Sequence, residues 1–163
     1  MTGLYYELKE KTLQICLKNN LLGEKISIRA RTLSPEEAIG NPERDDFPLK
    51  KGKESLMQAE IRGALGQAFT DRFGDFEGTV KEVFSMPLEN NFRRAVFLAT
   101  LNAVLRHLGL IKGTIHCRDQ GPKECSIQMA SYIRSRFGRV KVAQVGFQPS
   151  IAEAMAGIFP FRL

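Results

Sequence analysis

Residues 140–155 read Val140-Lys-Val-Ala-Gln-Val-Gly-Phe-Gln-Pro-Ser-Ile-Ala-Glu-Ala-Met155, and this stretch decides the predicted fold of the C-terminal part. The β-branched run over 140–145 predicts a buried strand. Gly146 permits a sharp turn, and Pro149 suits the first position of a helix, where its missing N–H group needs no partner. A strand, a glycine turn and a helix in this order build open α/β sheets, whose ligands bind at the carboxyl ends of the strands.

An earlier stretch has the same order, with a short strand predicted over 114–115, a turn, and a helix over 122–137. Two parallel strands joined by this crossover helix would bring His116, Cys117 and Gly146 to one edge of the sheet. A binding site is therefore expected there. The residues expected on the buried face of the helix are Ile127, Ala130, Ile133 and Phe137.

The first 110 residues predict an α+β domain. Apolar periodicity and capping signals predict helices over 4–18, from 35 to about 39, from 80 to about 85, and over 92–108. Alternating patterns predict three strands of a small antiparallel sheet over 25–32, 55–62 and 67–70. The segment 43–54 has no periodicity and is expected to be a long ordered loop.

Asn102 is the polar member of the apolar stripe on the helix over 92–108. A carboxamide in that position needs hydrogen-bond partners, because an unsatisfied one costs about 1–3 kcal/mol. Two partners are open at this stage, a neighbouring loop and a bound ligand.

Composition favours a soluble globular protein, since 43% of the 163 residues are hydrophobic and 26% are charged. No apolar run approaches the roughly 20 residues of a membrane helix, and no secretory signal is recognisable at the N-terminus. The three cysteines are Cys16, Cys117 and Cys125. This odd, sparse count predicts reduced thiols and a cytoplasmic location.

Net charge is +6, and residues 111–163 carry eight basic and three acidic side chains. Arg134, Arg136, Arg139 and Lys141 form the densest basic group. A nucleic-acid surface is one interpretation, and a solvated helix end that complements the helix dipole is the other. The second is favoured, because no aromatic residues for base stacking are interleaved.

Residues 158–163 are expected to begin another strand, which suggests a fragment or natural half of a longer protein. Open edges of such a sheet would favour a homo-oligomer.

Five motifs in order resemble the heavy-metal chelation family of two-domain proteins, whose biochemistry is unsettled. The motifs are Gly40-Asn-Pro-Glu-Arg-Asp-Asp-Phe-Pro-Leu49, Gly66-Gln-Ala-Phe-Thr-Asp71, Arg94 through Leu105 with its Leu101-Asn-Ala103, His116-Cys117 and Gly146-Phe-Gln-Pro149. The resemblance implies an enolase N-terminal-like α+β domain over 1–110 and the first part of a Rossmann-like α/β domain over 111–163. It also implies a ligand site in the cleft between them.

The predicted ligand is a small anionic or metal-containing molecule. The residues predicted around it are Arg44, Asp45, Gly66, Gln67, Thr70, Asp71, Asn102, His116, Cys117, Gly146 and Pro149. His116 and Cys117 would contact the ligand, Asn102 and Gln67 would orient it, and Asp71 would hold a cation or fix the end of a hairpin.

A transition metal is the one cofactor that the sequence suggests. His116, Cys117 and Cys125 together would suit zinc, copper(I) or iron, although their spacing is not a standard zinc signature. Buried thiols and a hydrogen-bonded histidine are the alternative. Ordinary dinucleotide binding is rejected because the turn at Gly146 lacks the three-glycine fingerprint, whereas an anion at the amides that open the next helix stays open.

No catalytic residue is predicted. The main alternative function is an enzyme that acts on a small metabolite, such as a tetrapyrrole or pterin, in the same cleft. A nucleic-acid-binding module that uses the basic C-terminal part is a further alternative.

Overall fold

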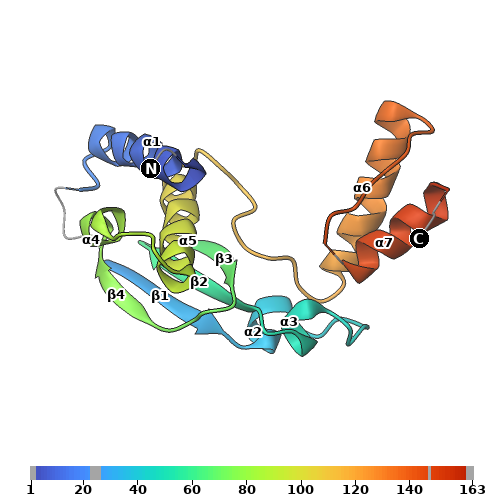
Figure 1. Ribbon diagram of the computed structural model, residues 1–163, viewed down its shortest axis with the longest axis horizontal. Coiled ribbons are helices and arrows are strands. Elements are labelled where there is room, and N and C mark those ends of the chain that lie inside the picture. Colours follow the sequence, from blue (N-terminus) through green and yellow to red (C-terminus); the bar gives the residue numbers. More distant parts are fainter. Residues whose placement is uncertain (1–2, 23–26, 147, 161–163) are drawn as a thin grey trace. The chain divides into compact units, whose positions relative to one another are not determined.

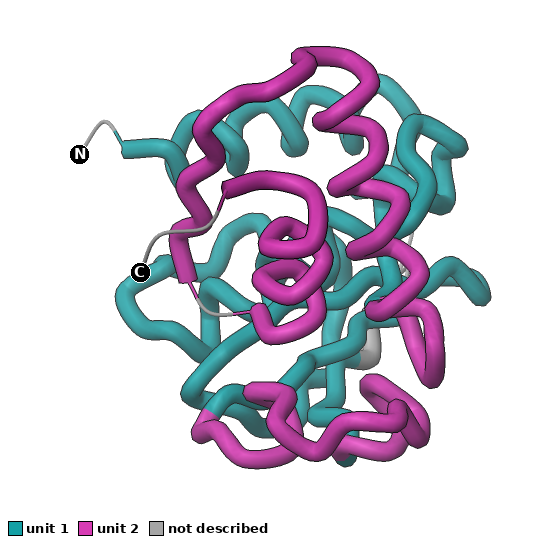
Figure 2. Tube along the Cα trace, turned by 90° about the vertical axis from the view of Figure 1, so that its right-hand side faces the viewer, with its two compact units in different colours: residues 1–34, 54–116 teal, residues 35–53, 117–163 magenta. Residues whose placement is uncertain are grey.

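The computed structural model describes residues 3–22, 27–146 and 148–160 (Figure 1). The chain divides into two compact units, coloured separately in Figure 2. Unit 1 comprises residues 1–34 and 54–116, and unit 2 comprises residues 35–53 and 117–163. Residues 35–53 therefore group with the C-terminal part of the chain, although the sequence suggested a single division near residue 110.

Unit 1 contains an antiparallel sheet in which the described strands follow the order β3-β2-β1-β4. The strands are β1 (Ser27–Leu33), β2 (Ser55–Ile61), β3 (Ala64–Thr70) and β4 (Phe76–Thr79). Ile61 pairs with Ala64. The two residues between them, Arg62 and Gly63, both have positive φ angles, of 48° and 80°. This pattern is typical of a type I′ hairpin turn, so the predicted hairpin is confirmed, with a second strand that begins three residues earlier than expected.

The helices of unit 1 are α1 (Leu4–Lys18), α4 (Val80–Ser85) and α5 (Asn91–His107). The predicted starts of α4 and, within one residue, of α5 are confirmed by their caps. Thr79 and Glu82 form a reciprocal capping box at α4, and the Asn90 side chain accepts a hydrogen bond of 2.9 Å from the Arg93 N–H group at α5. These side chains satisfy amide groups that the first turn of a helix otherwise leaves without partners.

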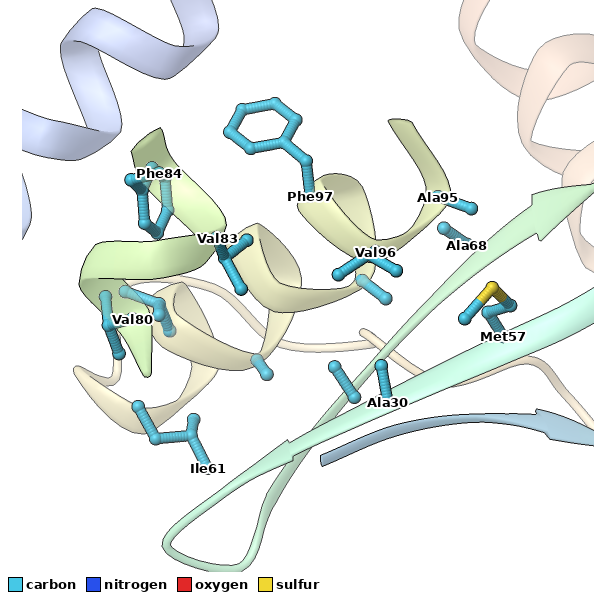
Figure 3. Close-up of a cluster of buried hydrophobic side chains, with 14 of the residues drawn as sticks. Ala30, Met57, Ile61, Ala68, Val80, Val83, Phe84, Ala95, Val96 and Phe97 are labelled. Atoms are coloured by element: carbon cyan, nitrogen blue, oxygen red, sulfur yellow. The ribbon is translucent and has the colours of Figure 1, made fainter. Parts of the chain in front are cut away.

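The core of unit 1 lies between α5 and one face of the sheet (Figure 3). Met57, Ala59 and Ile61 of β2 are fully buried on that face. On α4 and α5, Phe84 and Phe97 meet edge to face with ring centroids 5.5 Å apart. The same cluster takes in Cys16 of α1 and the apolar residues around it, so α1 covers part of the helical layer.

Unit 2 is helical in its described residues. Its helices are α2 (Pro35–Ile39), α3 (Pro48–Lys51), α6 (Gly121–Phe137) and α7 (Pro149–Ile158). Helices α6 and α7 pack together around Ala130, Met155 and Phe159. The predicted α2, α6 and α7 are confirmed. Helix α3 was missed, because its single turn lies inside the segment predicted to be a loop.

The two predicted parallel strands are wrong. Neither 114–115 nor 140–145 forms a strand, and Val145 is 99% exposed. β-Branched residues favour strands only where a neighbouring strand and an apolar layer receive them. Neither segment forms a ladder with a described strand, although one backbone hydrogen bond joins Thr114 to Gln67 of β3.

The predicted buried face of α6 is only partly right. Ala130 is fully buried, whereas Ile127 and Phe137 are 52% and 60% exposed. At a coarse level the fold is α+β, with mixed helices and an antiparallel sheet. None of the helices described here is long and apolar enough to span a membrane.

Two expectations fall outside the described residues. The beginning of the first predicted strand, at residues 25–26, is one, and the end of the strand predicted after residue 158 is the other. Ile158 itself is the last residue of α7, and Phe159 is buried against α6 and α7.

Candidate functional site

Three of the predicted site residues line one cavity in unit 1. Gln67, Asn102 and His116 border a space of about 240 Å³ together with Lys112 and Phe69. They come from β3, α5 and the segment 111–116 that follows α5. The structure thus brings together side chains that are far apart in the sequence.

Backbone hydrogen bonds explain why these segments converge. β3 is an edge strand of the sheet. The N–H group of Gln67 donates a hydrogen bond of 2.9 Å to the carbonyl of Thr114. The Thr114 hydroxyl donates 2.6 Å to the carbonyl of Leu65. Residues 111–116 therefore run beside β3 without forming a strand, and they cover polar groups that an edge strand would expose.

Asn102 bonds to the protein backbone. Its amide group donates 2.9 Å to the carbonyl oxygen of Gln67, which satisfies part of the carboxamide on this otherwise apolar helix face. The Gln67 side chain in turn donates a hydrogen bond of 2.8 Å to the side-chain oxygen of Gln58, and its own side-chain oxygen accepts one from the N–H group of His116. These bonds fix the positions of Gln67 and Asn102 in the wall of the cavity.

Basic groups dominate the electrostatics of the unit 1 cavity. Lys112 lines it, and Arg106 donates a hydrogen bond of 3.1 Å to the hydroxyl of Thr114, another lining residue. None of the described residues that line the cavity is Asp or Glu. The His116 ring also packs edge to face against Phe69, with centroids 5.6 Å apart. Sequence reasoning missed Lys112, because an isolated lysine after a helix gives no signal.

Gly66 was predicted to contact the ligand, but it packs against the backbone of α5. A Cβ atom at this position would overlap the backbone of α5 at Ala103 and Ala99. The absent side chain lets β3 and α5 approach closely, which is a common use of glycine in strands.

Thr70 and Asp71 belong to a different cavity of unit 1, of about 350 Å³. The Asp71 carboxylate accepts a hydrogen bond of 2.6 Å from the Asn91 side chain at the start of α5. The Thr70 hydroxyl donates 2.8 Å to the carbonyl of Arg72. Asp71 thus fixes the end of the hairpin against α5, which is one of its two predicted roles.

Arg44 lines a cavity of about 410 Å³ within unit 2. Its guanidinium group binds both Asp46 and Glu153. Hydrogen bonding from Arg44 lowers the pKa of the Asp46 carboxyl, and Asp46 raises the pKa of Arg44. Asp45 pairs with Lys50 at 2.8 Å, and this bond lowers the pKa of Asp45. Both carboxylates thus stay ionised and order the loop between α2 and α3.

Asp119 holds another part of unit 2 together. It has a positive φ of 54°, and its N–H group donates 2.8 Å to the carbonyl of Ile39. Its carboxylate accepts 2.9 Å from the N–H group of Asn41. The end of α2 is therefore attached to the start of α6, which positions the loop that contains Arg44.

Gly146 and Pro149 have the local conformations that the sequence predicts. Gly146 has a φ of 83°, which a residue with a side chain rarely adopts. Pro149 is the first residue of α7 and is buried. With no strand before Gly146, however, the predicted meeting of two strand ends is wrong.

The cysteines differ in accessibility, since Cys16 is buried and Cys117 and Cys125 are exposed. Burial raises the pKa of Cys16 from its ordinary value of 9.0 to about 11. Partial burial and the neighbouring Cys125 raise the pKa of Cys117. Across the described residues, no three His, Cys, Asp or Glu side chains form a group that could hold a metal ion. The predicted ligand set of His116, Cys117 and Cys125 is thus not assembled.

Thiol modification at pH 8 is expected to label Cys117 and Cys125 and to spare Cys16, because its thiol is inaccessible and poorly ionised. Mass spectrometry would count two labels in the folded protein and three in denaturant. Three labels on the folded protein at pH 8 would contradict the burial of Cys16.

Because the folded-state pKa of Cys16 is raised, its contribution to stability is present below pH 9.0 and is lost as the pH rises towards about 11.

Comparison of the chain with family models, with curated proteins and with solved structures finds no match.

Proposed function

We propose that the chain binds a small anionic ligand in the unit 1 cavity. The observation that carries the proposal is the lining itself, in which Lys112 and polar side chains from β3 and α5 border about 240 Å³. A carboxylate or phosphate group suits such a lining, because ammonium and amide groups donate to its oxygens. Fixed amide groups add specificity, since their positions do not have to be ordered when the ligand binds.

Each side chain has a separate role in this proposal. Lys112 supplies the positive charge, and Arg106 adds to it through its bond to Thr114. Asn102 and Gln67 orient the ligand, as the sequence predicts, from positions that their own hydrogen bonds hold. His116 forms one wall against Phe69. Of the two predicted ligand classes, anionic and metal-containing, the proposal takes the anionic one, because the lining offers hydrogen-bond donors and positive charge.

We also propose the fold likeness that the sequence implied, an enolase N-terminal-like domain followed by part of a Rossmann-like domain. The antiparallel sheet of unit 1, with α1, α4 and α5 on one side (Figure 1), supports the first part. The strand predicted over 140–145 in unit 2 is not formed, so the described residues give the second part no support. The resemblance to the heavy-metal chelation family and the cytoplasmic location also stay predictions.

Substitution of Lys112 by glutamine tests the proposal. Calorimetric titration with inorganic phosphate is expected to show at least tenfold weaker binding, because a hydrogen bond to a charged group contributes about 1.5–3 kcal/mol and 1.4 kcal/mol is a factor of ten. Lys81→Gln is the matched control, since this exposed lysine on α4 carries the same charge away from the cavity.

The salt dependence of phosphate affinity is a second measurement in the same experiment. Phosphate affinity of the unchanged chain is expected to fall as sodium chloride is raised. Equal phosphate affinities for Lys112→Gln and Lys81→Gln, or no phosphate binding by the unchanged chain at millimolar concentration, would contradict the proposal.

A further inference from the structure

The unit 2 cavity has the size of a small-molecule site. Its volume is about 410 Å³, within the range of roughly 300–1,000 Å³ that is usual for ligand pockets. Three segments border it, namely the loop after α2, the first turns of α6 and the first turns of α7. These segments are held together by ion pairs between Arg44 and Glu153 and between Lys123 and Glu43. The walls are therefore ordered without a ligand.

The first turn of α7 faces this cavity through Ser150, which is one of its lining residues. α7 is ten residues long and begins with Pro149, and its first-turn N–H groups donate no hydrogen bond to the side chain of the N-cap residue, Gln148. Amide groups in such a first turn lack partners within the helix, and the helix dipole places partial positive charge there. This end of α7 is consequently suited to an anion.

Ser150 gives an independent indication of a ligand. The residue is only 8% exposed, and its buried hydroxyl has no hydrogen-bond partner among the described residues. Buried hydroxyl groups almost always have a partner, because leaving one unsatisfied is unfavourable. An acceptor atom of a bound molecule in the cavity would satisfy it.

The rest of the lining is apolar or already paired. Phe47, Ile127 and Ala154 supply hydrocarbon surface. The acidic lining residues Glu43 and Glu153 form ion pairs with Lys123 and with Arg44, which also binds Asp46, and the Asp119 carboxylate accepts a hydrogen bond from the Asn41 N–H group. The cavity thus has one end with hydrogen-bond donors and an apolar wall.

We infer that the unit 2 cavity binds a small carboxylate with an apolar body. The carboxylate accepts hydrogen bonds from the Ser150 hydroxyl and from the amides of the first turn of α7. The apolar body packs against Phe47, Ile127 and Ala154. This site is separate from the unit 1 cavity, and it does not depend on the function proposed for that cavity.

Three probes separate the parts of this inference when they are titrated into the full chain. Phenylacetate carries both the charge and the apolar body, 2-phenylethanol keeps the body without the charge, and acetate keeps the charge without the body. Phenylacetate is expected to bind at least tenfold more tightly than either of the others. Equal affinities for phenylacetate and 2-phenylethanol, or no binding of phenylacetate at millimolar concentration, would overturn the inference.

The Ser150→Ala variant tests the role of the hydroxyl. It is expected to bind phenylacetate about tenfold more weakly, and its melting temperature is expected to be unchanged or higher, because the substitution removes an unsatisfied buried group. Ser135→Ala on α6, an exposed serine outside the cavity, is the matched control. Unchanged phenylacetate affinity in Ser150→Ala would also overturn the inference.

The Lys112→Gln variant keeps the two proposed sites distinguishable. It is expected to retain the phenylacetate site of unit 2 whatever its effect on phosphate binding in unit 1. Loss of phenylacetate binding in Lys112→Gln, with Ser150→Ala unaffected, would assign the carboxylate to the unit 1 cavity and refute the inference.

Discussion

Replacement of Gly66 by alanine is expected to lower the free energy of unfolding of unit 1 by about 3 kcal/mol or more. The added methyl group would overlap the backbone of α5 at Ala103 and Ala99. Backbone atoms cannot move aside as the end of a flexible side chain can, so β3 and α5 would have to separate. That separation would open the core between the sheet and α5 (Figure 3).

Gly157→Ala is the matched control for Gly66→Ala. A Cβ atom at Gly157 meets nothing within 4 Å, and this residue lies inside α7. Alanine is expected to be neutral or to stabilise the helix by up to about 1 kcal/mol. Urea denaturation followed by circular dichroism gives both values, and hydrogen exchange in β3 and α5 identifies the affected unit. A small, equal effect of the two substitutions would show that β3 and α5 are not closely packed.

Replacement of Phe97 by alanine is expected to cost about 3–5 kcal/mol, the usual range for a buried aromatic residue. Phe97 is fully buried and contacts Phe84 edge to face. Its removal would leave a cavity in the helical layer that α1, α4 and α5 form. The measurement is the midpoint of urea denaturation of unit 1, with the slope checked for a change in the denatured state.

Phe73→Ala is the matched control for Phe97→Ala. Phe73 is 57% exposed, so its truncation is expected to change stability by no more than about 0.5 kcal/mol. If Phe97→Ala cost less than about 1 kcal/mol, the layer between α1 and α5 would have to be loosely packed, contrary to the burial of Cys16 and Val96 beside it.

Local signals in the sequence predicted the helices well. The capping box of Thr79 and Glu82, the N-cap Asn90 and the first-turn prolines of α2, α6 and α7 are each decided by neighbouring residues. Such motifs act through hydrogen bonds of a single turn, so they need no knowledge of the rest of the fold. The hairpin of β2 and β3 was predictable for the same reason.

A strand with no alternating pattern of its own was not predictable. β4 consists of Phe-Glu-Gly-Thr, which has no alternating pattern, and it forms because β1 pairs with it. The β-branched run over 140–145 has the composition of a strand but lacks a neighbouring strand in the described part of the chain. Strand formation is decided by pairing as much as by residue type.

The candidate site was partly predictable. Gln67, Asn102 and His116 were expected in one site, and they line one cavity of unit 1. The contribution of Lys112 could not be foreseen, because it depends on how residues 111–116 run beside β3. The hydroxyl of Ser150 was also missed, since a serine in the first turn of a helix is ordinary until its lack of a partner is known.

The discontinuity of unit 2 affects how the chain can fold during synthesis. Residues 35–53 leave the ribosome before β2, β3, β4 and α5, but their partners lie in α6 and α7. They must therefore wait for more than sixty further residues to be translated. A recombinant fragment that begins at residue 117 would lack Glu43, Arg44 and Phe47, which line the unit 2 cavity. Failure of such a fragment to bind a ligand would therefore say nothing about the intact unit.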